Sequence, residues 1–272
     1  MRIIVPIKQI LDPTGFVVNR RRERIFINRE EYIINPCDKN ALEEALRLKD
    51  ERGAEVIAIS LGEARADDAL REALAMGADS AILLSDEILA QADISAAAKA
   101  LAAAIERIGD YDLILVGQES ADTGAGQMGP RLAEALGLAQ VCEVRQFSVA
   151  DGTVRAKRPW RGSYIEVEAP LPAVLTIAPD VNKPRYPHGA RILNAYREWE
   201  VTTWGVADLG LTEEELAPIV EFRGRTFPPP REFGERITGS PEEAARELVQ
   251  YLASKRLGVL ASKRRSVQAP KR

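Results

Sequence analysis

The clearest chemical signal lies in residues 116–130, where an apolar run gives way to small residues and then to a helical pattern. Gly117, Gly124 and Gly126 let the backbone turn with its amides exposed. Exposed amides at the start of a helix bind anions, so this segment predicts a phosphate-binding loop. It matches neither the Walker pattern nor the dinucleotide fingerprint. A tight strand-to-helix connection without a ligand is therefore the alternative interpretation.

Asp122 stands within this loop and restricts what the loop can bind, because a carboxylate repels phosphate. Its side chain suits capping of the turn or accepting a hydrogen bond from a ribose hydroxyl. No set of nucleophile, base and orienting group can be assembled, since His188 is the only histidine and no serine has an elbow setting. The residues therefore predict a nucleotide holder without its own catalytic set, and leave open whether it works within an enzyme complex.

The elements that must position the loop alternate between apolar strands and amphipathic helices. Strands are expected at residues 3–7, 55–60, 81–84 and 112–116, with helical periods between them. Right-handed crossovers then build a doubly wound α/β fold around a mostly parallel sheet. With the first strand central, the second and third on one side and the fourth on the other, the topological switch lies between the first and fourth strands.

Four segments leave this sheet at the same carboxyl edge. They are Pro6, the stretch 35–38, Leu61 and the glycine-rich loop. Their convergence predicts a nucleotide-binding crevice from topology alone. Within the stretch 35–38, Asp38 is expected to cap the helix that follows, and a ligand-facing role is the alternative.

The chain after Gly137 changes character. Residues 141–149, 153–156 and 164–168 alternate like additional antiparallel strands, and residues 16–28 read as an excursion hairpin. Arg158 to Gly162 places two arginines around a tryptophan, which suits stacking on a nicotinamide or flavin, or a surface contact without a ligand. Residues 182–191 form a polar, proline-rich loop suited to partner recognition.

The expected domains are an α/β nucleotide-binding domain at residues 1–198 and a C-terminal arm and helix at 199–272. The arm lacks sheet periodicity, so we expect it to pack on a partner subunit. Ser240 with Glu243 marks a helix start within it.

Composition narrows the partners and the compartment. The 37 Lys and Arg against 41 Asp and Glu give a net charge of −4, which favours neither nucleic acid nor an anionic membrane as a partner. Two distant cysteines argue against zinc and suit a reducing compartment. With no leader and no long apolar run, we expect a cytoplasmic protein without membrane insertion.

These residues, taken together, resemble the beta subunit of the electron-transfer flavoproteins over nearly the whole chain. The motifs that carry the resemblance keep their order and approximate spacing, and they occupy residues 35–38, 75–79, 122–130, 171–174 and 182–186. The resemblance implies a heterodimer with an alpha subunit that holds the redox FAD, while the beta subunit binds AMP. The nucleotide-binding residues that it implies are Pro6, Asn35, Pro36, Cys37, Asp38, Leu61, Asp122, Thr123, Gly124, Ala125, Gly126, Gln127 and Met128.

The resemblance also implies a surface that recognises dehydrogenase partners or a quinone oxidoreductase. Its residues are Pro184, Arg185, Tyr186, His188, Gly189, Ala190, Arg191 and Ile192. Members with a shuttle role often carry a leucine in this loop, whereas this sequence has Gly189 and Ala190, which argues against docking through such an anchor.

The glycine-rich loop is similar in length to that of electron-bifurcating members, which bind a second FAD in place of AMP, although Thr123 and Gly124 replace their usual Gly-Asp. AMP and FAD therefore both stay open. The implied function is electron transfer between dehydrogenases or NADH and a quinone- or ferredoxin-linked acceptor. The competing hypothesis is a stand-alone adenine-nucleotide-binding regulator or hydrolase on the same fold.

Overall fold

We describe a computed structural model of the chain, covering residues 1–220, 223–224, 226–229, 234 and 236–254. Its contacts divide the chain into two units, Met1–Arg223 and Gly224–Arg272. Residues 199–223, expected in the arm, thus belong to the first unit by their contacts. The packing of the rest of the arm on a partner subunit stays a prediction.

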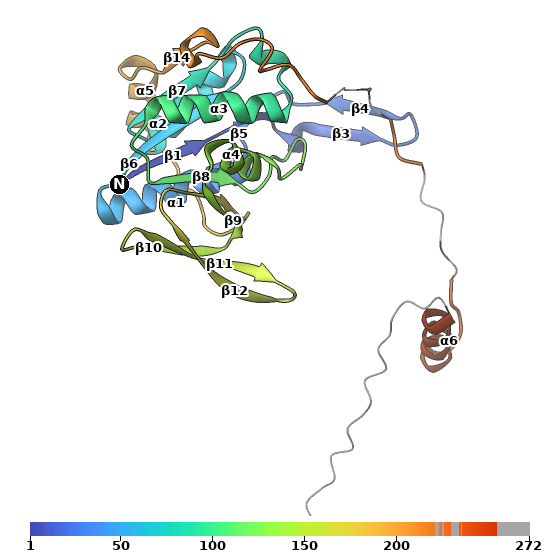
Figure 1. Cartoon of the computed structure of the whole chain (residues 1–272). Helices are drawn as coiled ribbons and strands as arrows, with labels where there is room; N and C mark the ends of the chain where they lie inside the picture. The colour runs from blue at the N-terminus through green and yellow to red at the C-terminus, as the bar shows by residue number, and fades with distance from the viewer. Residues whose placement is uncertain (221–222, 225, 230–233, 235, 255–272) are drawn as a thin grey trace, which may run out of the picture. The chain divides into compact units, whose positions relative to one another are not determined.

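The first unit is built on a seven-stranded parallel sheet (Figure 1). All six pairings in it are parallel. β1 is central, with β6 and β7 on one side and β8 on the other, which confirms the predicted strand order. In spatial order the strands are β14 (Thr202–Trp204), β7 (Ser80–Leu84), β6 (Glu55–Leu61), β1 (Arg2–Pro6), β8 (Leu113–Gly117), β13 (Ala173–Ile177) and β9 (Ala139–Val144).

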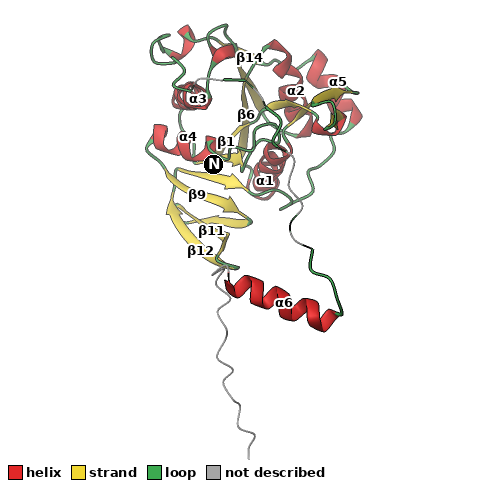
Figure 2. Cartoon of the chain, turned by 90° about the vertical axis from the view of Figure 1, so that its right-hand side faces the viewer, coloured by secondary structure: helices red, strands yellow, loops and turns green. Residues whose placement is uncertain are grey.

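Helices cover both faces of this sheet, as Figure 2 shows with the sheet between two helical layers. One layer holds α1 (Pro36–Arg52) and α2 (Asp67–Met76), with α5 (Gly189–Arg197) against α2. The other holds α3 (Ile94–Ile108) and α4 (Met128–Leu136). Successive residues of β1 alternate between the layers, since Ile3 and Val5 join the first apolar core and Ile4 the second.

Smaller antiparallel elements extend from this body. β10 (Gln146–Ala150), β11 (Thr153–Trp160) and β12 (Ser163–Pro170) form one sheet, β2 (Gln9–Leu11) pairs with β5 (Tyr32–Ile34), and β3 (Phe16–Asn19) with β4 (Arg24–Ile27). The expected hairpin at 16–28 is confirmed, and Figure 1 shows it projecting from the body. Short 3-10 turns occupy Pro13–Gly15, Ala64–Ala66, Leu89–Gln91 and Ala207–Leu209.

The single antiparallel strand expected at residues 141–149 is wrong. The chain there makes two strands, and the first of them, β9, lies parallel to β13 in the main sheet. The register shifts near its end, where Glu143 has a φ of +57°. Such a bulge turns the strand out of the sheet, so that β10 can start a new one.

The second unit contains α6 (Pro241–Ser254). Its start is confirmed as a capping box, because the Ser240 amide donates to Glu243 Oε2 at 2.9 Å and the Glu243 amide donates to Ser240 Oγ at 3.3 Å. Leu248, Val249 and Tyr251 of this helix are exposed.

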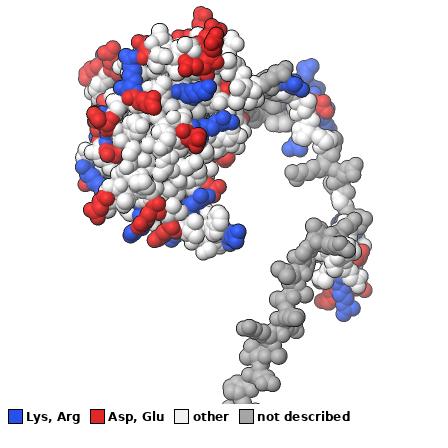
Figure 3. All heavy atoms as spheres, in the orientation of Figure 1, with Lys and Arg blue, Asp and Glu red and all other residues white. Residues whose placement is uncertain are grey.

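Acidic and basic side chains are interspersed on the face of the first unit seen in Figure 3. Among the described residues, no helix combines the length and the apolar character that crossing a bilayer requires.

Candidate functional site

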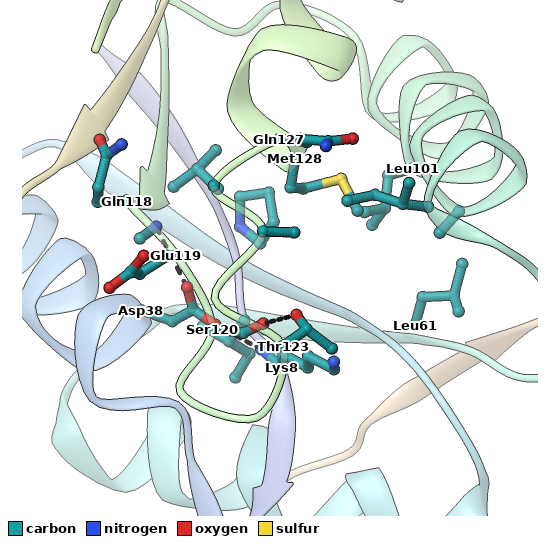
Figure 4. Close-up of a pocket in the computed structure, with 18 of the residues that line it drawn as sticks. Lys8, Asp38, Leu61, Leu101, Gln118, Glu119, Ser120, Thr123, Gln127 and Met128 are labelled. Carbon is teal, nitrogen blue, oxygen red and sulfur yellow. Dashed lines mark hydrogen bonds between the residues drawn. The ribbon is translucent and has the colours of Figure 1, made fainter. Parts of the chain in front are cut away.

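A cavity of about 340 Å³ opens where β1 and β8 end, between the amino ends of α3 and α4 (Figure 4). We call it the cleft. It lies at the predicted topological switch, where α/β sheets commonly bind ligands. Eight of the predicted nucleotide-binding residues line it, namely Pro6, Asp38, Leu61, Thr123, Ala125, Gly126, Gln127 and Met128.

The other five predicted residues do not line the cleft, and they are Asn35, Pro36, Cys37, Asp122 and Gly124. The Asn35 side chain fastens the loop, donating from Nδ2 to the Glu119 carbonyl at 2.9 Å and accepting the Ala121 amide at 3.0 Å. Pro36 opens α1 with the buried Cys37 after it, and burial raises the pKa of that thiol. These two residues therefore shape the cleft from behind.

Asp38 does not cap α1, so that expectation is wrong. Asn35 is the N-cap residue, and the Asp38 carboxylate reaches across to the strand ends instead, accepting the Lys8 amide at 2.9 Å and the Gly117 amide at 3.2 Å. Asp38 is the third residue of α1, and its side chain faces the elements that pack on the first turn of that helix. Here these are the ends of β1 and β8. Asp38 is 6 % exposed, and this burial, opposed by the amide hydrogen bonds, raises its pKa to about 7.

The glycine-rich loop folds as a turn whose later amides have no partner among the described residues. The Gly124 amide donates to the Ser120 carbonyl at 2.7 Å, and the Ser120 and Thr123 hydroxyls bond at 2.8 Å. Gly124 and Gly126 both have a φ of +60°, which favours glycine. Within the described residues, none of the amides from Ala125 to Gly129 has a hydrogen-bond partner.

These free amides stand at the start of α4, whose N-cap residue, Gln127, makes no side-chain cap. Helix amides without partners and the helix dipole together attract an anion. The α4 side of the cleft is thus suited to a phosphate. Lys8 lines the cleft as well, beside Thr123 (Figure 4), and its Nζ lies 2.6 Å from Asp122 Oδ2.

The opposite wall is apolar. It consists of Leu61, Met128 and three residues of α3, which are Ile94, Ala97 and Leu101. The α3 residues and Lys8 were not predicted as site residues. The spacing of 94, 97 and 101 places these residues on one face of a helix. The same spacing is found in helices that pack in a core, so the sequence alone does not show whether this face borders a cavity. Lys8 follows Pro6 by two positions and could have been included with it.

The predicted recognition loop lies in the other helical layer, away from the cleft. Residues 184–188 lead into α5, which packs on α2. Arg185 donates to Glu43 from its amide and Nε, both at 2.9 Å, and Arg191 donates to the Leu74 and Ala75 carbonyls. The structure therefore does not bring Pro184, Arg185, Tyr186, His188, Gly189, Ala190, Arg191 and Ile192 to the cleft.

Individual residues of this loop face different surroundings. His188 caps α5, its Nδ1 accepting the Ala190 amide at 3.3 Å. Tyr186 is 89 % exposed, and Leu193, one turn into the helix, is exposed as well. Tyr186 and Ile192 border a second cavity beside α2.

The segment from Arg158 to Gly162 forms the end of the β11–β12 hairpin. The Arg161 guanidinium lies 5.4 Å from the Trp160 ring centre, and Arg158 lies 3.8 Å from Glu143. None of its residues lines the cleft, and they border a separate open cavity instead. The cation-on-ring contact is present, and stacking on a nicotinamide or flavin stays a prediction.

Known proteins match most of this chain. Residues 24–209 match the electron transfer flavoprotein domain. The electron transfer flavoprotein subunit beta of Thermoanaerobacterium thermosaccharolyticum is 38 % identical over 258 residues, covering 94 % of this chain and 99 % of that protein. The chain belongs to the electron transfer flavoprotein family.

Two other relatives also match over most of the chain. The caffeyl-CoA reductase-Etf complex subunit CarD of Acetobacterium woodii is 36 % identical, covering 94 % of this chain and all of that protein. The protein FixA of Azorhizobium caulinodans is 34 % identical, covering 78 % of each. The chain is a beta subunit of this electron-transfer family, beta subunits pair with an alpha subunit, and the stand-alone regulator or hydrolase is not favoured.

Proposed function

We propose that the cleft of this beta subunit binds an adenine nucleotide, either AMP or the AMP part of a second FAD. The single observation that supports this most is the run of partnerless amides from Ala125 to Met128 at the start of α4, in residues that border a cavity of about 340 Å³. Amides at a helix start have no acceptor within the helix, so at the wall of a cavity they can donate to an anionic ligand.

The charges around the cleft suggest which way the nucleotide lies. The phosphate would accept from the amides of 125–128, while the uncharged base would pack on Leu61, Leu101 and Met128. Asp122, paired with Lys8, would accept a hydrogen bond from a ribose hydroxyl. The residues present thus fit an adenine nucleotide, and Asn35 would support it by fastening the loop.

Electron transfer would then depend on the alpha subunit, which we propose holds the redox FAD. AMP in the cleft would be a structural ligand, whereas a second FAD would supply a flavin that accepts and donates electrons. The donor would be a dehydrogenase or NADH, and the acceptor a quinone- or ferredoxin-linked protein. A relative named as a subunit of the caffeyl-CoA reductase-Etf complex supports a place in such a larger assembly.

Two surfaces of the chain would serve its partners. Residues 184–192 and the exposed Tyr186 and Leu193 would meet the dehydrogenase or quinone oxidoreductase, and the exposed apolar residues of α6 would pack on the alpha subunit. Both described cysteines, Cys37 and Cys142, are free thiols, which suits the cytoplasm.

The test is to denature the purified alpha–beta complex and identify the nucleotides it releases. AMP with one FAD indicates a shuttle, two FAD indicate a bifurcating type, and one FAD alone would contradict a nucleotide in the cleft. The variant Gly126→Val should lose the cleft nucleotide, because its side chain meets a φ of +60° and stands 3.6 Å from the Gln118 carbonyl oxygen.

Gly152→Val is the matched control for that variant. Gly152 also has a positive φ, +72°, but stands in the β10–β11 turn with nothing within 4 Å of an added Cβ. The control carries a similar backbone strain and should keep the nucleotide. Equal retention by both variants would mean that the loop does not hold the ligand.

A further inference from the structure

Asp93 stands at the rim of the cleft and binds two distant parts of the chain at once. Its Oδ1 accepts the amides of Ser95 and Ala96, both at 2.9 Å, as the N-cap of α3. Its Oδ2 accepts the amides of Ile219 at 2.9 Å and Val220 at 3.0 Å. One carboxylate therefore joins the start of α3 to backbone that follows 126 residues later.

Those two amides end a segment, residues 205–220, which we call the return segment. It follows β14 and runs along α3 from the carboxyl end of that helix to its amino end. Arg107 donates to the Asp208 carbonyl near one end, and Lys99 Nζ donates to the Glu215 carbonyl at 3.0 Å further along. Of the three α3-side anchors, only Asp93 also lines the cleft.

The last residues of the return segment depend on Asp93 more than on packing. Leu216 is 2 % exposed and belongs to the apolar core beside α3, whereas Ile219 and Val220 are 73 % and 59 % exposed. Side chains that remain in solvent contribute little to holding their backbone. The two hydrogen bonds to Oδ2 are therefore what fixes this end of the segment before the chain continues to the second unit.

The lowered pKa and the partial exposure of the Asp93 carboxylate both suit this role. Burial opposes its ionisation, but the four amide hydrogen bonds outweigh that effect and lower its pKa. The group is only partly buried, and its remaining exposure is toward the cleft and the surrounding solvent. Water that reaches a carboxylate competes for its hydrogen bonds, and excluding that water strengthens them.

We propose that Asp93 couples occupancy of the cleft to the anchoring of the return segment, so that a nucleotide in the cleft tightens the hold on Ile219 and Val220. This coupling rests on the proposed function, because it needs a nucleotide beside Asp93. Linkage makes it reciprocal, so a secured return segment also favours the bound nucleotide. Asp93 acts here as a positioning residue for the root of the C-terminal arm.

The test follows amide hydrogen exchange in peptides covering residues 212–220 of the alpha–beta complex, first freed of nucleotide and then saturated with AMP, with FAD in a parallel series. In the wild type, exchange at Ile219 and Val220 should slow by about threefold or more on binding. In Asp93→Asn, exchange should be roughly tenfold faster and respond little to nucleotide, because the asparagine oxygen can serve α3 or the return segment but not both.

Asp86→Asn is the matched control. Asp86 also joins a turn to the return segment, accepting the Ile88 and Val206 amides at 3.1 Å each, but it does not line the cleft. This variant should loosen the segment near Val206 and leave the nucleotide response at 219–220 unchanged. Asp93→Ser, which keeps an N-cap for α3 but cannot also span to the return segment, should behave like Asp93→Asn.

The outcomes separate this inference from the proposed function. If neither AMP nor FAD binds the wild-type complex, the nucleotide assignment fails, and the coupling with it. If a nucleotide binds while exchange at 219–220 stays unchanged, or slows equally in wild type and Asp93→Asn, the cleft is a nucleotide site but the coupling is refuted.

Discussion

The cleft proposed for a nucleotide and the loop predicted to recognise partners use their polar groups in opposite ways. At the cleft, side chains such as Asp38 and Asn35 hold the backbone, and the amides of 125–129 are left without partners. At the loop, Arg185 and Arg191 are used in holding the backbone to α1 and α2, and Tyr186 is left in solvent.

The two regions are therefore suited to different kinds of binding partner. Free amides at a helix start present a fixed array of donors, which suits a small anion. A fastened loop with an exposed aromatic side chain presents shape and apolar area, which suits a protein surface. The contrast predicts that damage to the cleft affects ligand retention, and that damage to the loop does not.

The largest effect is expected from Gly117→Ala at the cleft. An added Cβ would stand 2.2 Å from Asp38 Oδ1 and 2.6 Å from the Asp38 backbone nitrogen, so the start of α1 must move. We expect a loss of roughly 3 kcal/mol or more in the free energy of unfolding, together with loss of the nucleotide. Urea denaturation and analysis of released nucleotide measure the two.

Gly124→Ala is the matched control for this prediction. Gly124 lies in the same loop with a φ of +60° and nothing within 4 Å of an added Cβ. Gly124→Ala should lower the free energy of unfolding by only about 1 kcal/mol, because alanine is strained at this positive φ. Comparable losses in the two variants would show that contact with Asp38 is not what matters.

A smaller effect is expected from Glu43→Ala under the recognition loop. Glu43 is 5 % exposed and accepts three hydrogen bonds from Arg185. Removing it leaves that guanidinium without its main partner, at a cost of roughly 2 to 3 kcal/mol, below the upper range for buried pairs because Arg185 is partly exposed. Hydrogen exchange should rise in residues 182–192, and the nucleotide should be retained.

Tyr186→Ala provides the control, since a side chain 89 % exposed should change stability by less than about 0.5 kcal/mol. Loss of the nucleotide from Glu43→Ala would contradict the separation of the two regions.

The smallest effect concerns pH and the buried carboxylate of the cleft. The pKa of Asp38 is about 7 in the folded protein against 3.8 for the free group, so the folded state holds the proton more tightly. Ionisation of this group therefore lowers the free energy of unfolding as the pH rises, by roughly 2 kcal/mol between about pH 5 and pH 7. Asp38→Asn removes that contribution.

The measurement is urea denaturation of wild type and Asp38→Asn at several pH values, taking the difference between them so that other titrating groups cancel. As the pH rises, the free energy of unfolding of Asp38→Asn should increase relative to that of the wild type. Parallel curves would mean that Asp38 is not the buried titrating group.

Local patterns in the sequence determined much of this fold. Apolar runs alternating with helical periods set the parallel sheet and its strand order, because short crossovers have one favoured hand. The glycines at 124 and 126 were recognisable as turn formers, and both adopt a positive φ. Topology then indicated the cleft, since every parallel strand ends at the same edge.

Only the tertiary structure decided how the individual groups are used. Asp38 reads as a helix cap in the sequence but bonds to Lys8 and Gly117, and Asp93 bonds to amides 126 residues away. A carboxylate can cap its own helix or serve any other nearby donor, and local sequence does not say which donors will be near. That choice depends on long-range packing, because most buried polar groups are paired and the partner is whichever group the fold brings near.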